Sequence, residues 1–276
     1  MRAFVVTVEA ADVDAASGVL WGLGVRAIEE RAGDSGDEVE LWTSVGDAPQ
    51  AIERAVAALR GRWGHSVVEI DHVDAAASQR WRDFASPVWV DEGLVVVPAW
   101  HEAPGSPMAV SVEPGAAFGL GDHPTTLTSL RALLRLLRSE LRTDDVIDVG
   151  CGTGVIAVTA AMLLDRPVRA IDVASAAVEV TLDTARRNGV EHLVSVDTVP
   201  LADIDRDYDL VVANILAPVL VSLAEDLRRV TRPDGRLVIS GILADSHQHV
   251  LDALSPMQVV ATDVLDGWAC VELRHP

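Results

Sequence analysis

The sequence predicts an α/β protein whose main domain is a doubly wound, mostly parallel sheet of seven strands, preceded by a small α+β domain of the ferredoxin-like type. Three observations lead to this prediction. After Asp145, short apolar runs alternate with helical stretches, as in parallel sheets with crossover helices. One apolar run, Val146–Val149, ends in a glycine-rich turn, G-C-G-T-G, which leads into an apolar helix. The first 72 residues have the order strand-helix-strand-strand-helix-strand.

Residues 1–72 are expected to fold as a unit of their own. Asp12 or Asp14 can cap the first helix, which runs to Leu23 and ends at Gly24. The turn A-G-D-S-G-D separates the second strand from the third. The expected strands are 4–8, 25–30, 38–43 and 66–70, and the second helix is 50–59. No residue here indicates catalysis, so the unit is either a substrate-recognition domain or a stabilising appendage.

Residues 73–84 combine alanine with charged residues and have no clear apolar face, which is typical of a linker helix. The main domain then spans 85–276 and alternates regularly. Its predicted strands are 89–97, 146–149, 168–172, 194–197, 209–213 and 236–240, followed by a hairpin of 258–265 and 268–273. Its predicted helices are 127–141, 155–164, 175–188, 218–230 and 245–254. The last strand is expected to run antiparallel at the edge of the sheet.

A second glycine-rich segment, P-G-A-A-F-G-L-G-D-H-P-T-T, covers Pro114–Thr126. It reads either as an ordinary loop or as a flap whose end caps the following helix. In the second interpretation, Thr125 or Thr126 supplies a hydroxyl at the helix start.

Composition excludes several classes of function. The net charge is −20, and all 22 basic residues are arginine. Without lysine, neither a nucleotide-hydrolysing P-loop nor Schiff-base catalysis is possible. The acidity argues against direct nucleic-acid binding and would favour a basic partner. No apolar run approaches the length of a membrane helix, and the two cysteines are too few for a disulfide framework or a zinc site. We therefore expect a cytoplasmic protein without a metal.

The glycine spacing in the main turn identifies a class of ligand. A dinucleotide fold requires a third glycine at position 155, which is Val155 here. The pattern is instead D-x-G-x-G-x-G, and Asp172 follows 22 positions after Gly150, where a carboxylate can accept both hydroxyls of a ribose. Asp148 would repel a pyrophosphate and suits a cationic amino group. Asp148 as a cap of its own loop and Asp172 as a plain helix cap stay open, but together the acids favour S-adenosylmethionine over NAD.

Asn214 follows an apolar strand in A-N-I-L-A, where a crevice is expected to open. Its amide oxygen can accept the protons of an attacking amine, although a turn-forming Asn is the plainer interpretation. Enzymes that methylate amino nitrogens often carry Asn-Pro-Pro-Tyr at this place. Here Ile215 and Leu216 follow, so that side lacks an aromatic wall. His123 is a candidate general base, against a structural role next to proline.

At this point the chain resembles a known family. The segments P-G-A-A-F-G-L-G-D-H-P-T-T, D-V-G-C-G-T-G, V-A-N-I-L-A and I-S-G-I-L occur in the order and spacing of the PrmA family, which methylates ribosomal protein L11 of the large subunit. The resemblance covers essentially the whole length, including the W-R-D-F segment. It implies a class I S-adenosylmethionine-dependent methyltransferase domain and an N-terminal domain that recognises the ribosomal protein. It also implies transfer to lysine side chains and to the N-terminal amine.

The resemblance also implies site residues. Matching the motifs gives cofactor contacts at Thr126, Gly150, Asp172 and Asn214, with Phe118 on the flap over the cofactor. Asp148 and Gly152 join this set from the turn, and Asn214 is the predicted catalytic residue. One departure is Leu120, where the family pattern A-F-G-T-G has Thr, so the flap lacks a hydroxyl.

Two alternatives stay open for the function. One is a related methyltransferase that acts on another protein or on a small-molecule amine. The other is an NAD-dependent oxidoreductase, which the misplaced third glycine disfavours. With a ribosomal protein as its substrate, the enzyme is expected to be a monomer that contacts neither nucleic acid nor membrane.

Overall fold

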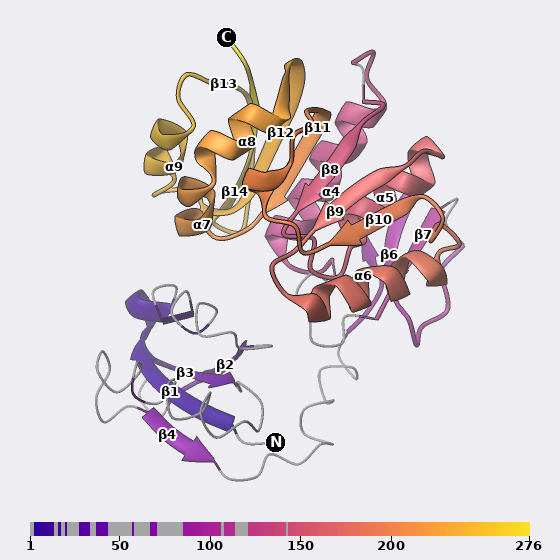
Figure 1. Cartoon of the computed structure of the whole chain (residues 1–276). Helices are drawn as coiled ribbons and strands as arrows, with labels where there is room; N and C mark the ends of the chain where they lie inside the picture. The colour runs from indigo at the N-terminus through magenta and orange to yellow at the C-terminus, as the bar shows by residue number, and fades with distance from the viewer. Residues whose placement is uncertain are drawn as a thin grey trace. The chain divides into compact units, whose positions relative to one another are not determined.

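The computed structural model describes residues 3–13, 16–17, 20, 28–33, 37–43, 57, 67–70, 85–105, 108–113, 121–141 and 143–276. The chain divides into two compact units, Met1–Ala85 and Ser86–Pro276, which are treated separately (Figure 1). The predicted linker helix at 73–84, all but residue 57 of the predicted helix at 50–59, and residues 114–120 of the predicted flap lie outside the described residues. Phe118 and Leu120 belong to that last stretch.

The first unit contains a four-stranded antiparallel sheet in the order β2-β3-β1-β4. This is the strand order of a ferredoxin-like sheet, in which β1 lies between β3 and β4. A short 3-10 turn, η1 (Ala10–Asp12), follows β1, and Val6, Leu20 and Leu41 are buried together. The strands are β1 (Ala3–Glu9), β2 (Ile28–Ala32), β3 (Glu38–Thr43) and β4 (Val67–Ile70).

The second unit is built on a seven-stranded sheet in the order β10-β9-β8-β11-β12-β14-β13. The first five strands in this order are parallel, and β14 pairs antiparallel with both β12 and β13. The predicted doubly wound sheet with an antiparallel hairpin at its edge is therefore confirmed. The strands are β8 (Val146–Val149), β9 (Val168–Ile171), β10 (Val194–Asp197), β11 (Tyr208–Asn214), β12 (Thr231–Leu243), β13 (Gln258–Leu265) and β14 (Trp268–Arg274).

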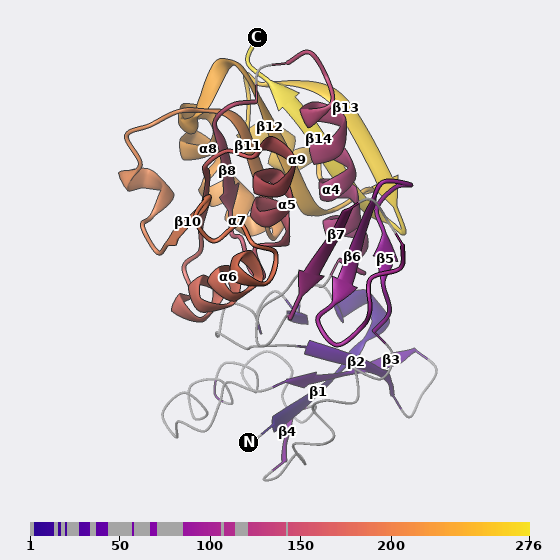
Figure 2. The ribbon, with the colours of Figure 1, turned by 90° about the vertical axis from the view of Figure 1, so that its right-hand side faces the viewer.

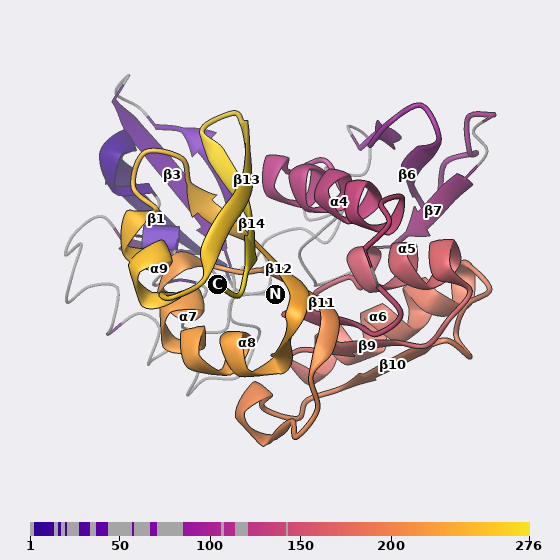
Figure 3. The same cartoon turned by 90° about the horizontal axis from the view of Figure 1, so that it is seen from above.

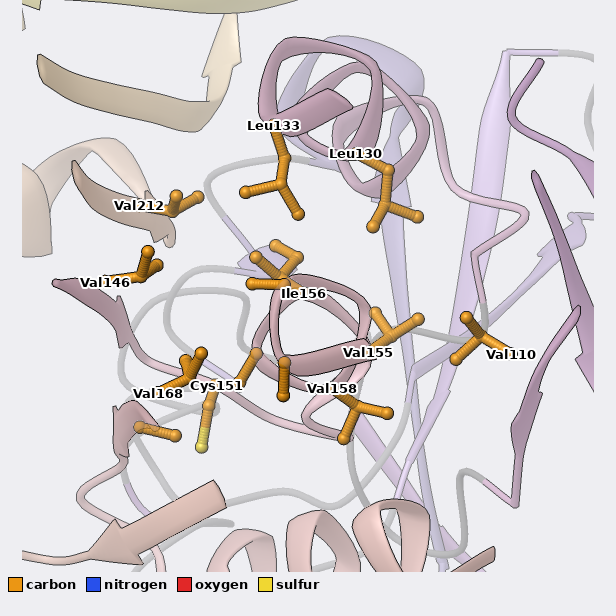
Figure 4. Close-up of a cluster of buried hydrophobic side chains, with 14 of the residues drawn as sticks. Val110, Leu130, Leu133, Val146, Cys151, Val155, Ile156, Val158, Val168 and Val212 are labelled. Carbon is orange, nitrogen blue, oxygen red and sulfur yellow. The ribbon is translucent and has the colours of Figure 1, made fainter. Parts of the chain in front are cut away.

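Helices cover both faces of this sheet (Figure 3). One group is α4 (Pro124–Leu137), α5 (Val155–Leu164) and α6 (Ser175–Arg187), and the other is α7 (Ala217–Ser222), α8 (Ala224–Val230) and α9 (Gln248–Ala253). Successive side chains of β8 point to opposite faces of the sheet, as they do in any β-strand. Val146 packs with Val212 and Ile156 in the core beside α4 and α5 (Figure 4), whereas Ile147 belongs to the core beside α7, α8 and α9.

Several local predictions were wrong. The expected strand 89–97 is a hairpin, β5 (Val88–Trp89) and β6 (Leu94–Pro98), because the Asp91 carboxylate accepts the Gly93 N–H and closes a turn between them. The expected helix 218–230 is divided into α7 and α8 at Leu223. The cap of α4 is His123 rather than Thr125 or Thr126, so the helix begins three residues earlier than predicted, at Pro124.

A third sheet lies beside α5 and α6 and consists of β5, β6 and β7 (Met108–Val112) (Figure 2). Asn188, at the end of α6, holds β7 through two bonds of 2.8 Å: its side chain donates to the Ser111 carbonyl and accepts from the Ser111 N–H. Strand β12 begins at Thr231, five residues before the predicted Arg236, and its register against β11 shifts across this interval, which contains P-D-G.

Within the ranges that the structure describes, no helix has both the length and the apolar composition to cross a membrane. The same residues include no group of three or more His, Cys, Asp or Glu side chains placed to hold a metal ion.

Candidate active site

The turn between β8 and α5 lies at the carboxyl edge of the sheet, where open α/β sheets bind ligands. Gly150, Gly152 and Gly154 all have positive φ values, of 75°, 54° and 76°, which only glycine adopts without strain. The N–H groups of Gly150 and Cys151 both donate to the Ile171 carbonyl, at 2.8 and 3.1 Å. These bonds hold the turn against the end of β9.

Asp172 connects this turn to the start of α6. One carboxylate oxygen accepts the Gly152 N–H at 3.0 Å, and the other accepts the Ala174 N–H at 2.9 Å. Ala174 is the N-cap residue of α6, and its N–H bond to Asp172 means that Asp172 also helps to order the start of this helix. A carboxylate offers about four acceptor positions in all. Two of them are used here, which leaves acceptor capacity on a half-buried group.

Val173 is the next residue, and 97% of its surface is exposed. It follows Asp172 directly at this edge of the sheet, although a single exposed apolar side chain does not by itself mark a ligand surface.

Asp148 lies inside β8 and is only 1% exposed. One of its oxygens accepts the Ala157 N–H of α5 at 3.1 Å, and the other has no hydrogen-bond donor among the described residues. Burial raises the pKa of Asp148 to about 7. The hydrogen bond from Ala157 lowers this pKa, and the negative charge of Asp172 raises it further. A buried oxygen without a donor is costly, and a donor supplied by a ligand would relieve that cost.

Cys151 separates the first two glycines of the turn and takes no part in nucleophilic chemistry. Its thiol lies 3.3 Å from the Thr181 hydroxyl, and burial raises the pKa of the Cys151 thiol far above its usual range. The thiolate, which is the reactive form, is therefore not populated.

Asn214 ends β11, and its side-chain nitrogen lies 3.4 Å from the Thr126 hydroxyl in the first turn of α4. His123 fixes this end of α4, since its Nδ1 accepts the Thr125 N–H at 3.3 Å and lies 2.8 Å from the Thr125 hydroxyl. Burial lowers the pKa of His123, with the Asp122 charge opposing, so the imidazole is neutral.

Trp268, the first residue of β14, packs edge-on against the His123 ring with the centroids 5.1 Å apart. Trp268 therefore supports the residue that caps α4, and this contact joins the start of α4 to the terminal hairpin.

The structure thus brings six predicted residues to one edge: Thr126, Asp148, Gly150, Gly152, Asp172 and Asn214. They come from β8, β11, α4 and the segments that follow β8 and β9. Phe118 lies outside the described residues.

The opposite, amino edge of the sheet contains a cavity of about 610 Å³, lined by residues that include Arg166, Arg169 and Tyr208. It shares no residue with the carboxyl-edge group. Ion pairs fill this edge, among them Arg166 with Asp144 and Arg206 with Asp145. Because ligands of such sheets bind beyond the carboxyl ends of the strands, we place the active site at the carboxyl edge.

Comparison with known proteins identifies the family. Residues 29–276 match the model of PrmA, the ribosomal protein L11 methyltransferases. The chain belongs to this family. It is 37% identical over 243 residues to the ribosomal protein L11 methyltransferase of Exiguobacterium sp., covering 86% of this chain and 75% of that protein. It is 38% identical over 255 residues to that of Chromohalobacter salexigens, covering 86% and 83%.

A solved structure agrees with this placement. The ribosomal protein L11 methylase from Lactobacillus delbrueckii subsp. bulgaricus superposes with a TM-score of 0.63 at 27% identity, over 70% of this chain and all of that one. Members of the family are S-adenosylmethionine-dependent methyltransferases with the class I fold, and so is this enzyme. The NAD-dependent alternative is thereby set aside.

Proposed function

We propose that this enzyme transfers methyl groups from S-adenosylmethionine to amino groups of ribosomal protein L11, on lysine side chains and at the N-terminus. The observation that carries the proposal is the position of Asn214, which lies beside Thr126 at the same sheet edge as the glycine turn. Similarity to L11 methyltransferases over most of the chain supports the choice of substrate.

The residues at the carboxyl edge fit the cofactor. We propose that the spare acceptor positions of Asp172 hold the ribose hydroxyls and that exposed Val173 covers one face of the adenine. The Asp148 oxygen that has no donor among the described residues fits a cationic amino group, and Gly150 and Gly152 lie in the turn that directly follows β8. The role of Phe118 over the cofactor stays a prediction.

When bound, S-adenosylmethionine supplies a methyl group on a positively charged sulfur. The acceptor amine must arrive without its proton, and orientation and desolvation are then the main tasks of the protein. Asn214 donates from its amide nitrogen toward Thr126, which turns its amide oxygen to other donors, and we propose that this oxygen accepts an N–H of the amine. His123 is used as the cap of α4, so its proposed role is structural.

We further propose that residues 1–72 recognise the ribosomal protein, joined by the predicted linker at 73–84. A net charge of −20 would steer a basic protein toward the enzyme. Ribosomal proteins are made in the cytoplasm, and the enzyme is proposed to act there as a monomer, without contacting nucleic acid or membrane.

The test uses isotope-labelled S-adenosylmethionine and unmodified large-subunit proteins, with the label mapped by mass spectrometry. Label is expected on lysine side chains and on the N-terminal amine of L11. Because the enzyme contains no lysine, methylation of its own lysine side chains cannot contribute to the signal. Label that appears only on another protein or on small amines would overturn the proposed substrate.

A further inference from the structure

Ile215, the residue after Asn214, lies directly over the first glycine of the turn. A Cβ added to Gly150 would lie 2.3 Å from Ile215 Cγ2. Apart from chain neighbours, no other described residue comes within 4 Å of that point. The branched methyl group of Ile215 therefore occupies the space that a side chain at position 150 would need.

The backbone of Ile215 is held from another direction by a second glycine. Gly241 has a φ of 83°, and a Cβ added there would lie 2.5 Å from the Ile215 carbonyl oxygen and 2.8 Å from its carbonyl carbon. The Ile215 N–H also donates to the Ser240 carbonyl at 3.2 Å. Ser240 is the residue paired with Asn214 in the sheet. Ile215 is thus fixed between two glycines that admit no side chain.

These contacts join three motifs that are distant in the sequence. Gly150 belongs to D-V-G-C-G-T-G, Ile215 to A-N-I-L, and Gly241 to I-S-G-I-L. The pairing of β8 with β11 sets how far apart these two strands lie, and Ile215, directly after Asn214, fills the remaining space above Gly150. Ile215 is also partly exposed, so part of it borders the site.

We propose that Ile215 is a positioning residue for methyl transfer: its Cγ2 branch sets the spacing between Gly150 and Asn214, and so the space in which the acceptor amine meets the methyl group. The inference rests on the proposed function. Ile215 offers no polar side-chain atom, so it would confine the amine without competing with Asn214 for its N–H bonds.

Two substitutions separate the branch from the rest of the side chain. Ile215→Val keeps a methyl group at the Cγ2 position, whereas Ile215→Ala removes it. With Ile215→Ala, kcat is expected to fall about 10-fold or more while the Kd for S-adenosylmethionine changes less than about 3-fold, because the loss affects orientation rather than binding. Ile215→Val is expected to restore most of the rate. Leu251→Ala is the matched control, since Leu251 packs partly buried against the same core and belongs to none of the three motifs.

A double-mutant cycle tests whether Ile215 acts through Asn214. If it does, adding Ile215→Ala to Asn214→Ala should lower kcat by less than about 2-fold beyond Asn214→Ala alone, because coupled residues are not additive. Additive losses, or a kcat loss in Leu251→Ala equal to that in Ile215→Ala, would overturn the proposal.

A measurement on the cofactor-free enzyme gives a readout without catalysis. Hydrogen exchange is expected to quicken at residues 150–154 and 213–216 in Ile215→Ala and to stay at the wild-type rate in Ile215→Val. Unchanged exchange at both segments in Ile215→Ala would also overturn the proposal. If the wild-type enzyme methylates no L11, the proposed substrate fails, while the exchange experiment still decides the role of Ile215.

Discussion

Asp172 illustrates how one carboxylate can serve both the protein and a ligand. It already accepts bonds from Gly152 and Ala174, so its position is fixed before any cofactor arrives. Replacing it with alanine should weaken S-adenosylmethionine binding by about 1–3 kcal/mol, the cost of losing hydrogen bonds to a charged group. Calorimetry on Asp172→Ala measures this, with exposed Glu179→Gln as the control on α6. Equal affinities for mutant and wild type would remove the ribose assignment.

Asp148 should make the stability of the cofactor-free enzyme depend on pH. Its pKa is raised from 3.8 to about 7 in the folded state, so the unfolded chain loses this proton first as pH increases. The free energy of unfolding should therefore fall between about pH 4 and pH 7, by at most about 4 kcal/mol from this group, and level off above that.

Asp148→Asn provides the check, because an amide does not titrate and its oxygen can still accept the Ala157 N–H. Urea unfolding at several pH values should show the variant gaining stability over the wild type as pH rises toward 8. A difference that stays constant from pH 4 to pH 8 would contradict the assigned pKa.

At the scale of elements, α4 depends on an unusual cap. Histidine is not among the preferred N-cap residues, yet His123 accepts the Thr125 N–H and packs on Trp268. His123→Ala should lower the free energy of unfolding by about 1 kcal/mol, whereas His123→Asn should keep the cap. If His123 acts only as a cap, the His123→Asn variant is expected to keep its activity. A large loss of kcat in His123→Asn with normal stability would instead support a general base.

The same helix shows where sequence patterns are sufficient and where they are not. Alternation of apolar runs with helical spacing predicted the mostly parallel main sheet and its antiparallel edge hairpin, because burial on both faces leaves a strong pattern. The start of α4 was misplaced because histidine is an uncommon cap, and the ring that packs on His123 comes from Trp268, which is far away in the chain. The turn at Asp91–Gly93 was missed because apolar residues continue on both sides of it.

The candidate site could be predicted from the sequence only in part. The glycines and Asp172 follow from local spacing, whereas Asn214 needed its motif context. The contact between Gly150 and Ile215, by contrast, joins positions 65 residues apart, and only the fold brings them together. Trp268 likewise meets His123 only because the fold brings the terminal hairpin to the start of α4.

For the whole molecule, an arginine at the amino edge of the sheet holds three segments together. Arg232 bonds to Asp209 at 2.5 Å, to Asp145 at 2.8 Å and to Asp207 at 3.1 Å, and these carboxylates raise the pKa of Arg232. Asp209 is almost fully buried and also accepts the Asp145 N–H. Asp209→Ala should therefore lower the free energy of unfolding by about 2–4 kcal/mol.

Urea unfolding measures that loss, and calorimetry with S-adenosylmethionine should show an unchanged Kd because the proposed cofactor site lies at the other edge. Asp205→Ala, which removes an exposed acid nearby, serves as the control. A weakened cofactor affinity in folded Asp209→Ala would show that the two edges are not independent.

The separation of the two edges has a consequence for how such an enzyme can change. Substitutions that alter thermal tolerance can accumulate among the ion pairs around Arg232 without touching the residues that meet the cofactor. The carboxyl edge has no such freedom, since Ile215 ties the turn, Asn214 and Gly241 into one unit. Adaptation to a new growth temperature and adaptation to a new acceptor would therefore proceed at opposite ends of the same strands.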